Sequence, residues 1–201
     1  MDERKTNFER KSKETEIKGV LNIDGKGVTK IKTPIGLLDH MMELFAFHGF
    51  FDLELEVKGD THIDIHHTNE DIGIVLGKAF KKALGEKEGI KRFGRGAAPM
   101  ESTWSDVVID ISGRGYFSFM ADEKTVTAQE GYSLNDLEHF LESLAHNLGA
   151  TLIVKTYNAQ GADLHTIMET VFKSLGLALD QATQIDPRRG GSVPSTKGII
   201  D

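Results

Sequence analysis

The sequence has no cysteine, a single tryptophan, three tyrosines and only four prolines in 201 residues. Because disulfides and thiolate metal sites are thereby excluded, any metal site in this chain needs nitrogen and oxygen ligands. No apolar run approaches the length that spans a bilayer, and the opening sequence MDERK lacks the pattern of a signal peptide. We therefore expect a cytoplasmic protein with no membrane partner.

Positive charge is also scarce, because 24 lysines and arginines stand against 31 acidic residues and leave a formal net charge of −7. This balance gives no general attraction to nucleic acid, so we expect no nucleic-acid partner. An anionic ligand would need a local cluster of basic groups. The content of 39% hydrophobic and 27% charged residues is typical of a globular protein, and eleven phenylalanines predict a phenylalanine-filled core.

The pattern of apolar residues predicts a similar order of elements in both halves of the chain. After about ten loose, charged residues, alternation predicts a hairpin from Thr15–Ile23 and Val28–Lys32 around a turn at 24–27. Further strands are predicted at 51–57, 107–111, 116–120 and 151–156. Helical spacing predicts helices at 37–48, 66–84, 134–148 and 165–182, with Gly85 as the C-cap of the second.

An internal repeat explains this order. A shift of 99 residues aligns Leu38–Ala83 with Leu137–Ala182 without a gap and gives twelve identical pairs, whereas unrelated segments of that length would share about three. Duplication predicts an α+β fold with two similar sheet-plus-paired-helix halves in one compact pseudo-twofold unit. We expect the first half at residues 1–92, the second at 93–187 and a basic C-terminal tail at 188–201.

The repeat also singles out residues that can bind a metal ion. The identical pairs of this kind are His40 and His139, His66 and His165, and Glu70 and Glu169. Residues i and i+4 of a helix lie on one face, about 40° apart. His66 with Glu70, and His165 with Glu169, can therefore each hold one ion. His67 is turned by about 100° from His66 and points toward a different ion. A histidine pair on a helix is more often a solvated polar pair, but a second copy in register favours a metal site. Histidine and carboxylate ligands suit Mn, Fe, Zn, Co or Ni.

At these residues the chain resembles imidazoleglycerol-phosphate dehydratase, a lyase of histidine biosynthesis. The resemblance covers most of the chain and rests on the motifs KET at 13–15, LDHM at 38–41, GD at 59–60, HHTNED at 66–71, RFG at 92–94, DISGR at 110–114, EHF at 138–140, Glu169, FK at 172–173 and PSTKG at 194–198. It implies a ribosomal protein S5 domain 2-like fold for the halves. It also implies a cytoplasmic homo-oligomer, a symmetric shell of twenty-four subunits whose active sites lie at subunit interfaces.

The resemblance further implies two Mn²⁺ ions per active site and the dehydration of D-erythro-imidazole glycerol phosphate to imidazole acetol phosphate. One implied ligand set is His67, His139, His165 and Glu169, and the other is His40, His66, Glu70 and residue 166. Catalytic roles are implied for Glu14, Glu70 and Glu169, with Glu14 as the acid/base, although Glu14 could equally be an exposed hairpin charge. Phosphate contacts are implied for Arg92, Arg114, Lys173, Ser195 and Lys197, with His48 nearby, although each basic residue alone is more often a solvated surface charge.

The sequence departs from the family pattern at residue 166. Thr166 stands where the family has a histidine, and threonine is a poor ligand for such a metal, so that set keeps three protein ligands and its metal site is expected to be weakened. Three hypotheses follow. The first is an active dehydratase, the second a metal-binding, shell-forming homologue with weak or no activity, and the third a phosphate- or nucleotide-binding module on the same fold.

Overall fold

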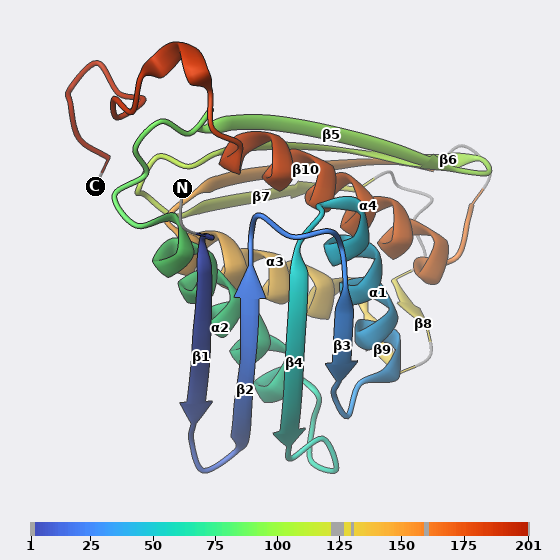
Figure 1. Ribbon diagram of the computed structural model, residues 1–201. Coiled ribbons are helices and arrows are strands. Elements are labelled where there is room, and N and C mark those ends of the chain that lie inside the picture. The colour runs from blue at the N-terminus through green and yellow to red at the C-terminus, as the bar shows by residue number, and fades with distance from the viewer. Residues whose placement is uncertain (1–2, 122–126, 130, 159–160, 201) are drawn as a thin grey trace.

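The protein consists of two four-stranded sheets with four helices between them (Figure 1). The computed structural model describes residues 3–121, 127–129, 131–158 and 161–200. Sheet 1 contains β1 (Lys5–Lys11), β2 (Thr15–Asn22), β3 (Thr29–Lys32) and β4 (Asp52–Gly59) in the order β1-β2-β4-β3. Sheet 2 contains β5 (Phe93–Met100), β6 (Thr103–Asp110), β7 (Tyr116–Met120) and β10 (Thr151–Asn158) in the order β5-β6-β10-β7.

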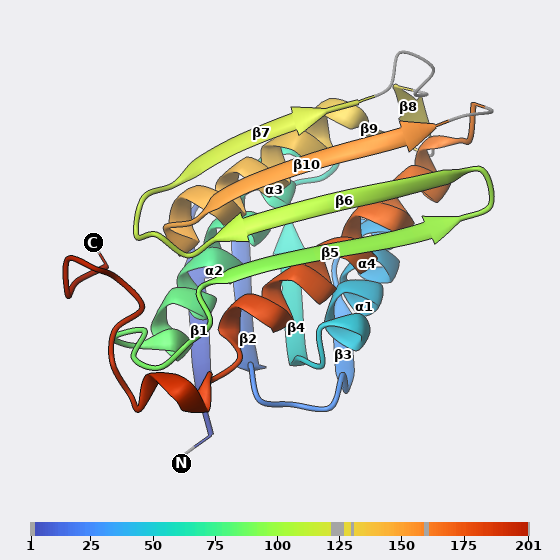
Figure 2. The same cartoon turned by 90° about the horizontal axis from the view of Figure 1, so that it is seen from above.

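The helices form the inner layers of the molecule. They are α1 (Gly36–His48), α2 (His66–Leu84), α3 (Leu134–Leu148) and α4 (Leu164–Thr183). Helices α1 and α2 contact sheet 1, α3 and α4 contact sheet 2, and the two pairs meet where α2 packs on α3 and α1 on α4. Figure 2 shows sheet 2 in front of these helices, with its strands crossing the direction of the sheet 1 strands behind. Each predicted helix is confirmed to within a residue or two at its ends.

The two sheets have the same topology, which confirms the duplicated α+β fold. In each sheet an antiparallel pair, β1–β2 or β5–β6, is followed by the strand after the first helix, and the short third strand pairs with that strand in parallel. The halves differ between their third strand and their first helix. In the second half this connection contains β8 (Ala128–Gln129) and β9 (Tyr132–Ser133), whereas residues 33–35 suffice in the first half.

The predicted hairpin of Thr15–Ile23 with Val28–Lys32 is wrong. Strand β4 lies between β2 and β3, pairing antiparallel with β2 and parallel with β3. The connection after β2 crosses the start of β4, where the Asp52 carboxylate accepts hydrogen bonds from the backbone N–H groups of Lys26 and Val28 at 2.8 and 2.9 Å. The turn residues at 24–27 were recognisable, but the strand that they span comes later in the chain.

The expectation of a loose start is wrong for residues 5–11, because all seven form β1 at the edge of sheet 1. The charged side chains of Lys5, Glu9 and Lys11 are exposed, while Thr6 is buried, Phe8 packs on the core and Arg10 pairs with Asp71. A charged edge strand of this kind resembles a solvated tail in sequence, because only one side chain in two needs to be apolar.

Two glycines at equivalent positions of the repeat let the inner helices approach closely. A Cβ atom on Gly77 of α2 would lie 2.6 Å from the Leu144 carbonyl oxygen of α3, and one on Gly176 of α4 would lie 2.5 Å from the Phe45 carbonyl oxygen of α1. Larger residues at either position would therefore push the helices apart. The identity of this pair in the repeat thus has a packing cause.

The core is one continuous cluster of buried side chains between the sheets. Phe45, Phe51 and Phe80 contact one another edge-on or tilted in the first half, and Phe140 contacts Phe172 in the second, which bears out the expected phenylalanine-filled core. The chain ends in a short 3₁₀ helix (Pro187–Arg189) and an irregular tail. Among the described residues, no helix is long and apolar enough to cross a membrane.

Candidate metal centre

One group of possible metal ligands lies where α1 meets α4. The Nε2 atoms of His40 and His165 each lie 3.4 Å from Oε1 of Glu169, and the ligand atoms of these three residues are all within 4.8 Å of one another. Two imidazole nitrogens and one carboxylate oxygen at this spacing match the donor types that bind first-row divalent ions. The arrangement therefore fits a metal such as Mn²⁺.

Glu169 is also paired with a cation on its own helix. Lys173, one turn further along α4, donates a hydrogen bond to Oε2 of Glu169 at 2.6 Å, and the Glu169 side chain is only 12% exposed. Burial of Glu169 opposes its ionisation, but Lys173 and His40 outweigh this effect and lower the pKa of the carboxyl below its ordinary value. The carboxylate is thus kept in the ionised form that a metal requires.

The second group lies where α2 meets α3, and it contains the repeat counterparts of the first. His139 Nδ1 lies 3.1 Å from His66 Nδ1, and His66 Nε2 lies 3.6 Å from Oε2 of Glu70. The two imidazole rings meet edge to face, with centroids 4.7 Å apart. This group is more open than the first, because Glu70 is 45% exposed.

A buried hydrogen-bond chain joins α2 to α3 beside the second group. Asn69 donates from its side-chain amide to the Asp136 carbonyl oxygen at 2.7 Å and accepts from the Tyr132 hydroxyl at 2.6 Å. Ser133 caps α3 by accepting from the Asp136 backbone N–H, and the Asp136 carboxylate accepts from the Ser133 backbone N–H in return. The segment that only the second half contains therefore fixes α3 against the start of α2.

The described chain does not bring either implied ligand set together. The structure groups His40 with His165 and Glu169, whereas the resemblance divides these residues between two sets. It likewise groups His139 with His66 and not with His165. Because the resemblance implies that these ligands meet across a subunit interface, one chain does not test the sets, and they stay a prediction.

His67 belongs to neither group and faces two other carboxylates. Its Nδ1 atom lies 3.4 Å from Oδ2 of Asp60, in the loop before α2, and 4.0 Å from Oε2 of Glu14, in the β1–β2 turn. The hydrogen bond to Asp60, followed by the charge of Glu14, raises the pKa of His67. Sequence reasoning recognised Glu14 and His67 but missed Asp60, although a Gly-Asp turn at 59–60 precedes the helix.

The turn that carries Glu14 is held by a residue adjacent to the metal-ligand candidates of α2. Asp71, nearly buried, accepts hydrogen bonds from the Thr15 hydroxyl at 2.5 Å and from Nε of Arg10 at 2.9 Å. Glu14 itself remains 52% exposed. Asp71 therefore fixes the backbone beside Glu14 while the Glu14 carboxylate stays accessible.

Thr166 lies in the first turn of α4, beside His165. Its backbone N–H donates to the carboxylate of Asp163, the N-cap residue of the helix, at 2.8 Å. This hydrogen bond is the main cause that lowers the pKa of Asp163. The Thr166 side chain contributes as the second cause, whereas the backbone hydrogen bond is compatible with other side chains at this position.

The implied phosphate contacts lie in two separate places. Lys173 and His48 are near the α1–α4 group, where burial, followed by the charge of Lys173, lowers the pKa of His48. Arg92 lies at the far end of α4, because its backbone N–H bonds to the Ala182 carbonyl oxygen. At 1.5 Å per residue, this position is roughly 25 Å from His165 along the helix.

Arg92 is fixed in its distant position. Its guanidinium binds the Asp110 carboxylate through two nitrogens at 2.6 and 3.0 Å and the Pro194 carbonyl oxygen of the tail at 3.0 Å. Ser195 and Lys197 follow in that tail, where the Ser195 hydroxyl accepts from the Lys197 backbone N–H. Arg114 is exposed in the loop after β6, four residues beyond Asp110. A single chain therefore does not place these four residues beside the histidines.

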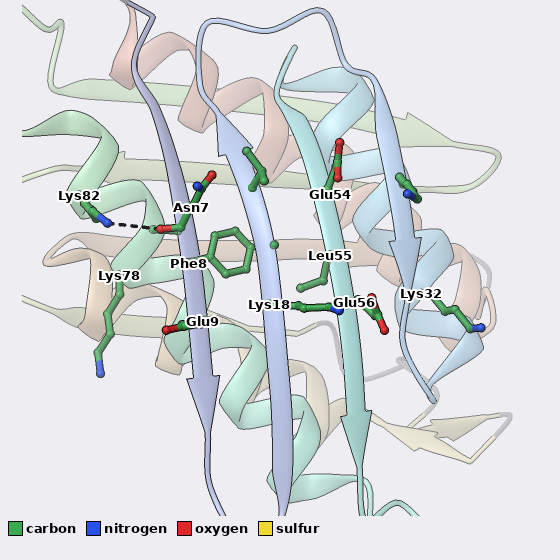
Figure 3. A pocket seen from close by; sticks show the side chains of 14 residues that line it. Asn7, Phe8, Glu9, Lys18, Lys32, Glu54, Leu55, Glu56, Lys78 and Lys82 are labelled. Carbon is green, nitrogen blue, oxygen red and sulfur yellow. Dashed lines mark hydrogen bonds and ion pairs between the residues drawn. The ribbon is translucent and has the colours of Figure 1, made fainter.

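A cavity of about 980 Å³ lies on sheet 1, away from the histidines (Figure 3). Phe8, Leu55 and the hydrophobic stems of lysines line it, and Lys18 forms an ion pair with Glu56 at 3.0 Å across neighbouring strands. No residue of the implied site lines this cavity. Its lining mixes lysines with glutamates and contains no histidine, so it does not compete with the histidine groups as the functional site.

Comparisons with known proteins identify the family. The family model of imidazoleglycerol-phosphate dehydratase matches residues 33–179. Among curated relatives, imidazoleglycerol-phosphate dehydratases from Geobacter metallireducens and a Thermoanaerobacter strain are 47% and 48% identical, over 98% of this chain and 99% and 100% of theirs.

Solved structures agree with the sequence comparison. A crystal structure of the dehydratase from Pyrococcus furiosus superposes with a TM-score of 0.80 at 36% identity, covering 95% of this chain and 99% of the other. That of the Staphylococcus aureus dehydratase gives a TM-score of 0.78 at 29% identity, covering 90% of this chain and 100% of the other. With the family model, the relatives and the fold in agreement, the chain belongs to the imidazoleglycerol-phosphate dehydratase family and is a hydro-lyase.

Proposed function

We propose that the chain catalyses the Mn²⁺-dependent dehydration of D-erythro-imidazole glycerol phosphate to imidazole acetol phosphate in histidine biosynthesis. The observation that carries this proposal is the pair of repeat-related groups, each of which combines two histidines with one glutamate. Two metal-binding elements on one chain suit a substrate whose imidazole ring offers two nitrogen ligands. The relatives' names supply the substrate class.

The names of substrate and product define the proton transfers that the protein must support. In the product, imidazole acetol phosphate, the carbon bound to the ring is a methylene and the next carbon is a ketone. In the substrate, both of these carbons carry a hydroxyl. The hydroxyl therefore leaves the ring-bound carbon, and the neighbouring carbon loses its proton. The resulting enol then takes a proton on the ring-bound carbon and gives up its hydroxyl proton. Such a sequence needs a group that accepts, carries and returns protons.

Glu14 is our proposed acid/base. Its carboxylate is 52% exposed, lies near His67 and is carried by a turn that Asp71 anchors through Thr15. This combination of a fixed backbone and an accessible carboxylate suits a group that must reach a substrate carbon. Glu70 and Glu169 point toward histidines on their own helices, so we assign them to the metal and regard any proton transfer by them as secondary.

The metal would be held by nitrogen and oxygen donors alone. His66 with Glu70 and His165 with Glu169 would each hold one ion, and His40, His67 and His139 would complete the sets from a neighbouring subunit. Bound at the ring nitrogens, such ions would withdraw electron density from the imidazole and ease departure of the neighbouring hydroxyl. Histidine and carboxylate donors suit Mn²⁺ as well as other first-row metals, and the choice of Mn²⁺ follows the resemblance to the family.

We further propose a homo-oligomer, because a single chain separates the proposed phosphate contacts. Arg92, tied to Asp110 and the tail, is roughly 25 Å from His165 along α4. An active site formed between subunits would bring such residues to another chain's metal ligands. The outer face of sheet 2 supports association, because it exposes apolar side chains of Phe93, Trp104, Val108, Tyr116 and Met120.

A weak or inactive homologue is the second candidate, and Thr166 favours it. A threonine next to His165 supplies no nitrogen to the ligand set that contains His40, His66 and Glu70. The Asp163 carboxylate accepts a hydrogen bond from the Thr166 backbone N–H, which adds no metal ligand. In this candidate the chain binds one ion firmly and the other weakly.

Incubation of the purified protein with imidazole glycerol phosphate tests the two candidates. We expect product formation with Mn²⁺ and none after the metal is removed with a chelator, with recovery when Mn²⁺ is restored. Complementation of a histidine auxotroph that lacks this dehydratase provides the cellular test. Soluble, assembled protein that binds Mn²⁺ but neither forms product nor supports growth would establish the weak homologue in place of the active enzyme.

A further inference from the structure

Asp60 has a fixed position in the loop between β4 and α2. Its backbone N–H donates to the Glu14 carbonyl oxygen at 3.2 Å, and its own carbonyl oxygen accepts from the Ile63 N–H at 2.8 Å. The carboxylate is 15% exposed, and among the described residues its Oδ1 atom is buried without a hydrogen-bond partner. Its other oxygen, Oδ2, faces Nδ1 of His67 at 3.4 Å.

The geometry at His67 differs from that at the other histidines with a known carboxylate contact. His40 and His165 turn Nε2 toward Glu169, and His66 turns Nε2 toward Glu70. His67 instead turns Nδ1 toward carboxylates that belong to no ligand set. A neutral imidazole has one N–H, so donation from Nδ1 leaves a lone pair on Nε2 for a metal.

Asp60 and His67 are both replaced at the equivalent positions of the second half. With the shift of 99 residues, Asp60 aligns with Ala159 and His67 aligns with Thr166. The half that lacks the second histidine therefore also lacks the carboxylate that would orient it. Glu70 and Glu169, which face the first histidine of each pair, are identical in both halves.

We infer that Asp60 is a positioning residue that holds His67 in the Nδ1–H tautomer and turns its Nε2 toward a metal ion. Carboxylates in this relation to a histidine ligand fix the ring orientation and increase the basicity of the ligating nitrogen. Glu14, more exposed and further from Nδ1, is thereby left free for the substrate. The inference rests on the proposed metal-dependent function, because it requires His67 to be a ligand.

Titration of the metal-free protein with Mn²⁺ tests the role of Asp60. Electron paramagnetic resonance measures the unbound ion at each step. We expect Asp60→Asn to weaken one class of Mn²⁺ sites by about 10- to 100-fold. The matched control is Asp64→Asn, which removes a charge from the same loop while retaining an acceptor for the His66 backbone N–H. We expect this control to bind within about twofold of the wild type.

A double variant separates positioning from a general structural effect. In the His67→Ala background, we expect Asp60→Asn to cause no further loss of Mn²⁺ affinity. The d–d absorption bands of bound Co²⁺ should change with Asp60→Asn and remain unchanged with Asp64→Asn. Losses that multiply in the double variant, or wild-type affinity in Asp60→Asn, would overturn the inference.

A measurement on the wild type covers the case in which Asp60→Asn does not fold. Long-range ¹H–¹⁵N correlation spectra of the metal-free protein, at a pH where His67 is neutral, should show the Nδ1–H tautomer. The Nε2–H tautomer would refute the inference by itself. If the wild-type protein binds no Mn²⁺, then the proposed function fails as well, and this outcome is distinct from wild-type binding that is insensitive to Asp60.

Discussion

The two long inner helices begin differently although they come from the same duplication. Helix α2 begins with His66 and His67, and Asp60 and Glu14 lie beside His67. At the start of α4, His165 is followed by Thr166, whose backbone is capped by Asp163. The first helix start thus presents two histidines to its surroundings and the second presents one.

The two equivalent glutamates also differ, and here the residue of the second half is the more buried and the better paired. Glu169 is nearly buried and paired with Lys173, whereas Glu70 is 45% exposed and lies 3.6 Å from His66. The half with fewer ligands therefore has the more firmly held carboxylate. Duplication preserved the first histidine and the glutamate in both halves, while the second histidine and its supporting acid remain only in the first.

The largest expected effect concerns the turn of the first half that carries Glu14. Glu14→Gln should lower kcat by about 10²- to 10⁴-fold, because the proposed acid/base group is lost, while Mn²⁺ binding stays unchanged. The matched control is Glu101→Gln in the β5–β6 turn, the equivalent turn of the second half, which should leave kcat unaltered. Steady-state kinetics and Mn²⁺ titration of both variants measure this, and equal rates for wild type and Glu14→Gln would remove Glu14 from the mechanism.

A substitution that makes the two helix starts alike should have the next largest effect. Thr166→His should tighten the weaker class of Mn²⁺ sites on the order of tenfold, because an imidazole replaces a side chain without a suitable donor. The Asp163 cap on the backbone of residue 166 should persist. Unchanged Mn²⁺ affinity in calorimetric titration would mean that water or another group already completes the site, or that the repeat is misaligned here.

The two glutamates should differ in their contribution to stability in the metal-free protein. Glu169→Gln should lower the free energy of unfolding by about 1–2 kcal/mol, because Lys173 loses its partner in a mostly buried setting. Glu70→Gln should change it by less than about 0.5 kcal/mol. Denaturant unfolding at neutral pH measures both, and equal effects would show that the two environments are energetically alike.

This difference should also depend on pH. The pKa of Glu169 is lowered in the folded state, so its ionised form adds stability above the ordinary carboxyl pKa, and this contribution is lost as the pH falls through the lowered value. The gap between wild type and Glu169→Gln should therefore shrink in acid. A gap that widened below the ordinary carboxyl range would contradict the assigned direction.

The smallest expected effect is a difference between two histidines of the first half. In the metal-free protein the pKa of His67 is raised by Asp60 and Glu14, and the pKa of His48 is lowered by burial and by Lys173. Protonated His67 thus adds stability that is present below its unfolded pKa and is lost as the pH rises through the folded value. NMR titration of the imidazole signals should place the two midpoints on opposite sides of the ordinary value, and the reverse order would contradict both contacts.

The sequence predicted the elements whose pattern is local and missed those that depend on distant parts of the chain. Helices such as α2 and α3 were predicted with their ends, because amphipathic spacing and capping residues are local. Strand β1 was missed, since a charged edge strand shows little alternation, and the hairpin was wrong because β4 enters the sheet between β2 and β3. The repeat located the histidine and glutamate pairs from identities alone.

The spatial grouping of those residues was not accessible from the sequence. Which histidine meets which glutamate depends on α1 packing against α4 and α2 against α3, a tertiary arrangement that helical periodicity does not contain. Asp60 and Asp71 were missed for the same reason, because their partners, His67 and Thr15, come from other elements. Both lie in motifs that carry the resemblance, GD at 59–60 and HHTNED at 66–71, but these motifs do not show what either carboxylate contacts.

Anomalous diffraction at the manganese edge from crystals of the Mn²⁺-loaded protein tests the central claim most directly. Two sites are predicted, one bonded to His66 and Glu70 and the other to His165 and Glu169, each completed by histidines of a neighbouring subunit. The site that includes residue 166 should have the lower occupancy. Absence of manganese at both pairs in crystals grown with excess Mn²⁺, or an ion bound far from these four side chains, would contradict the account.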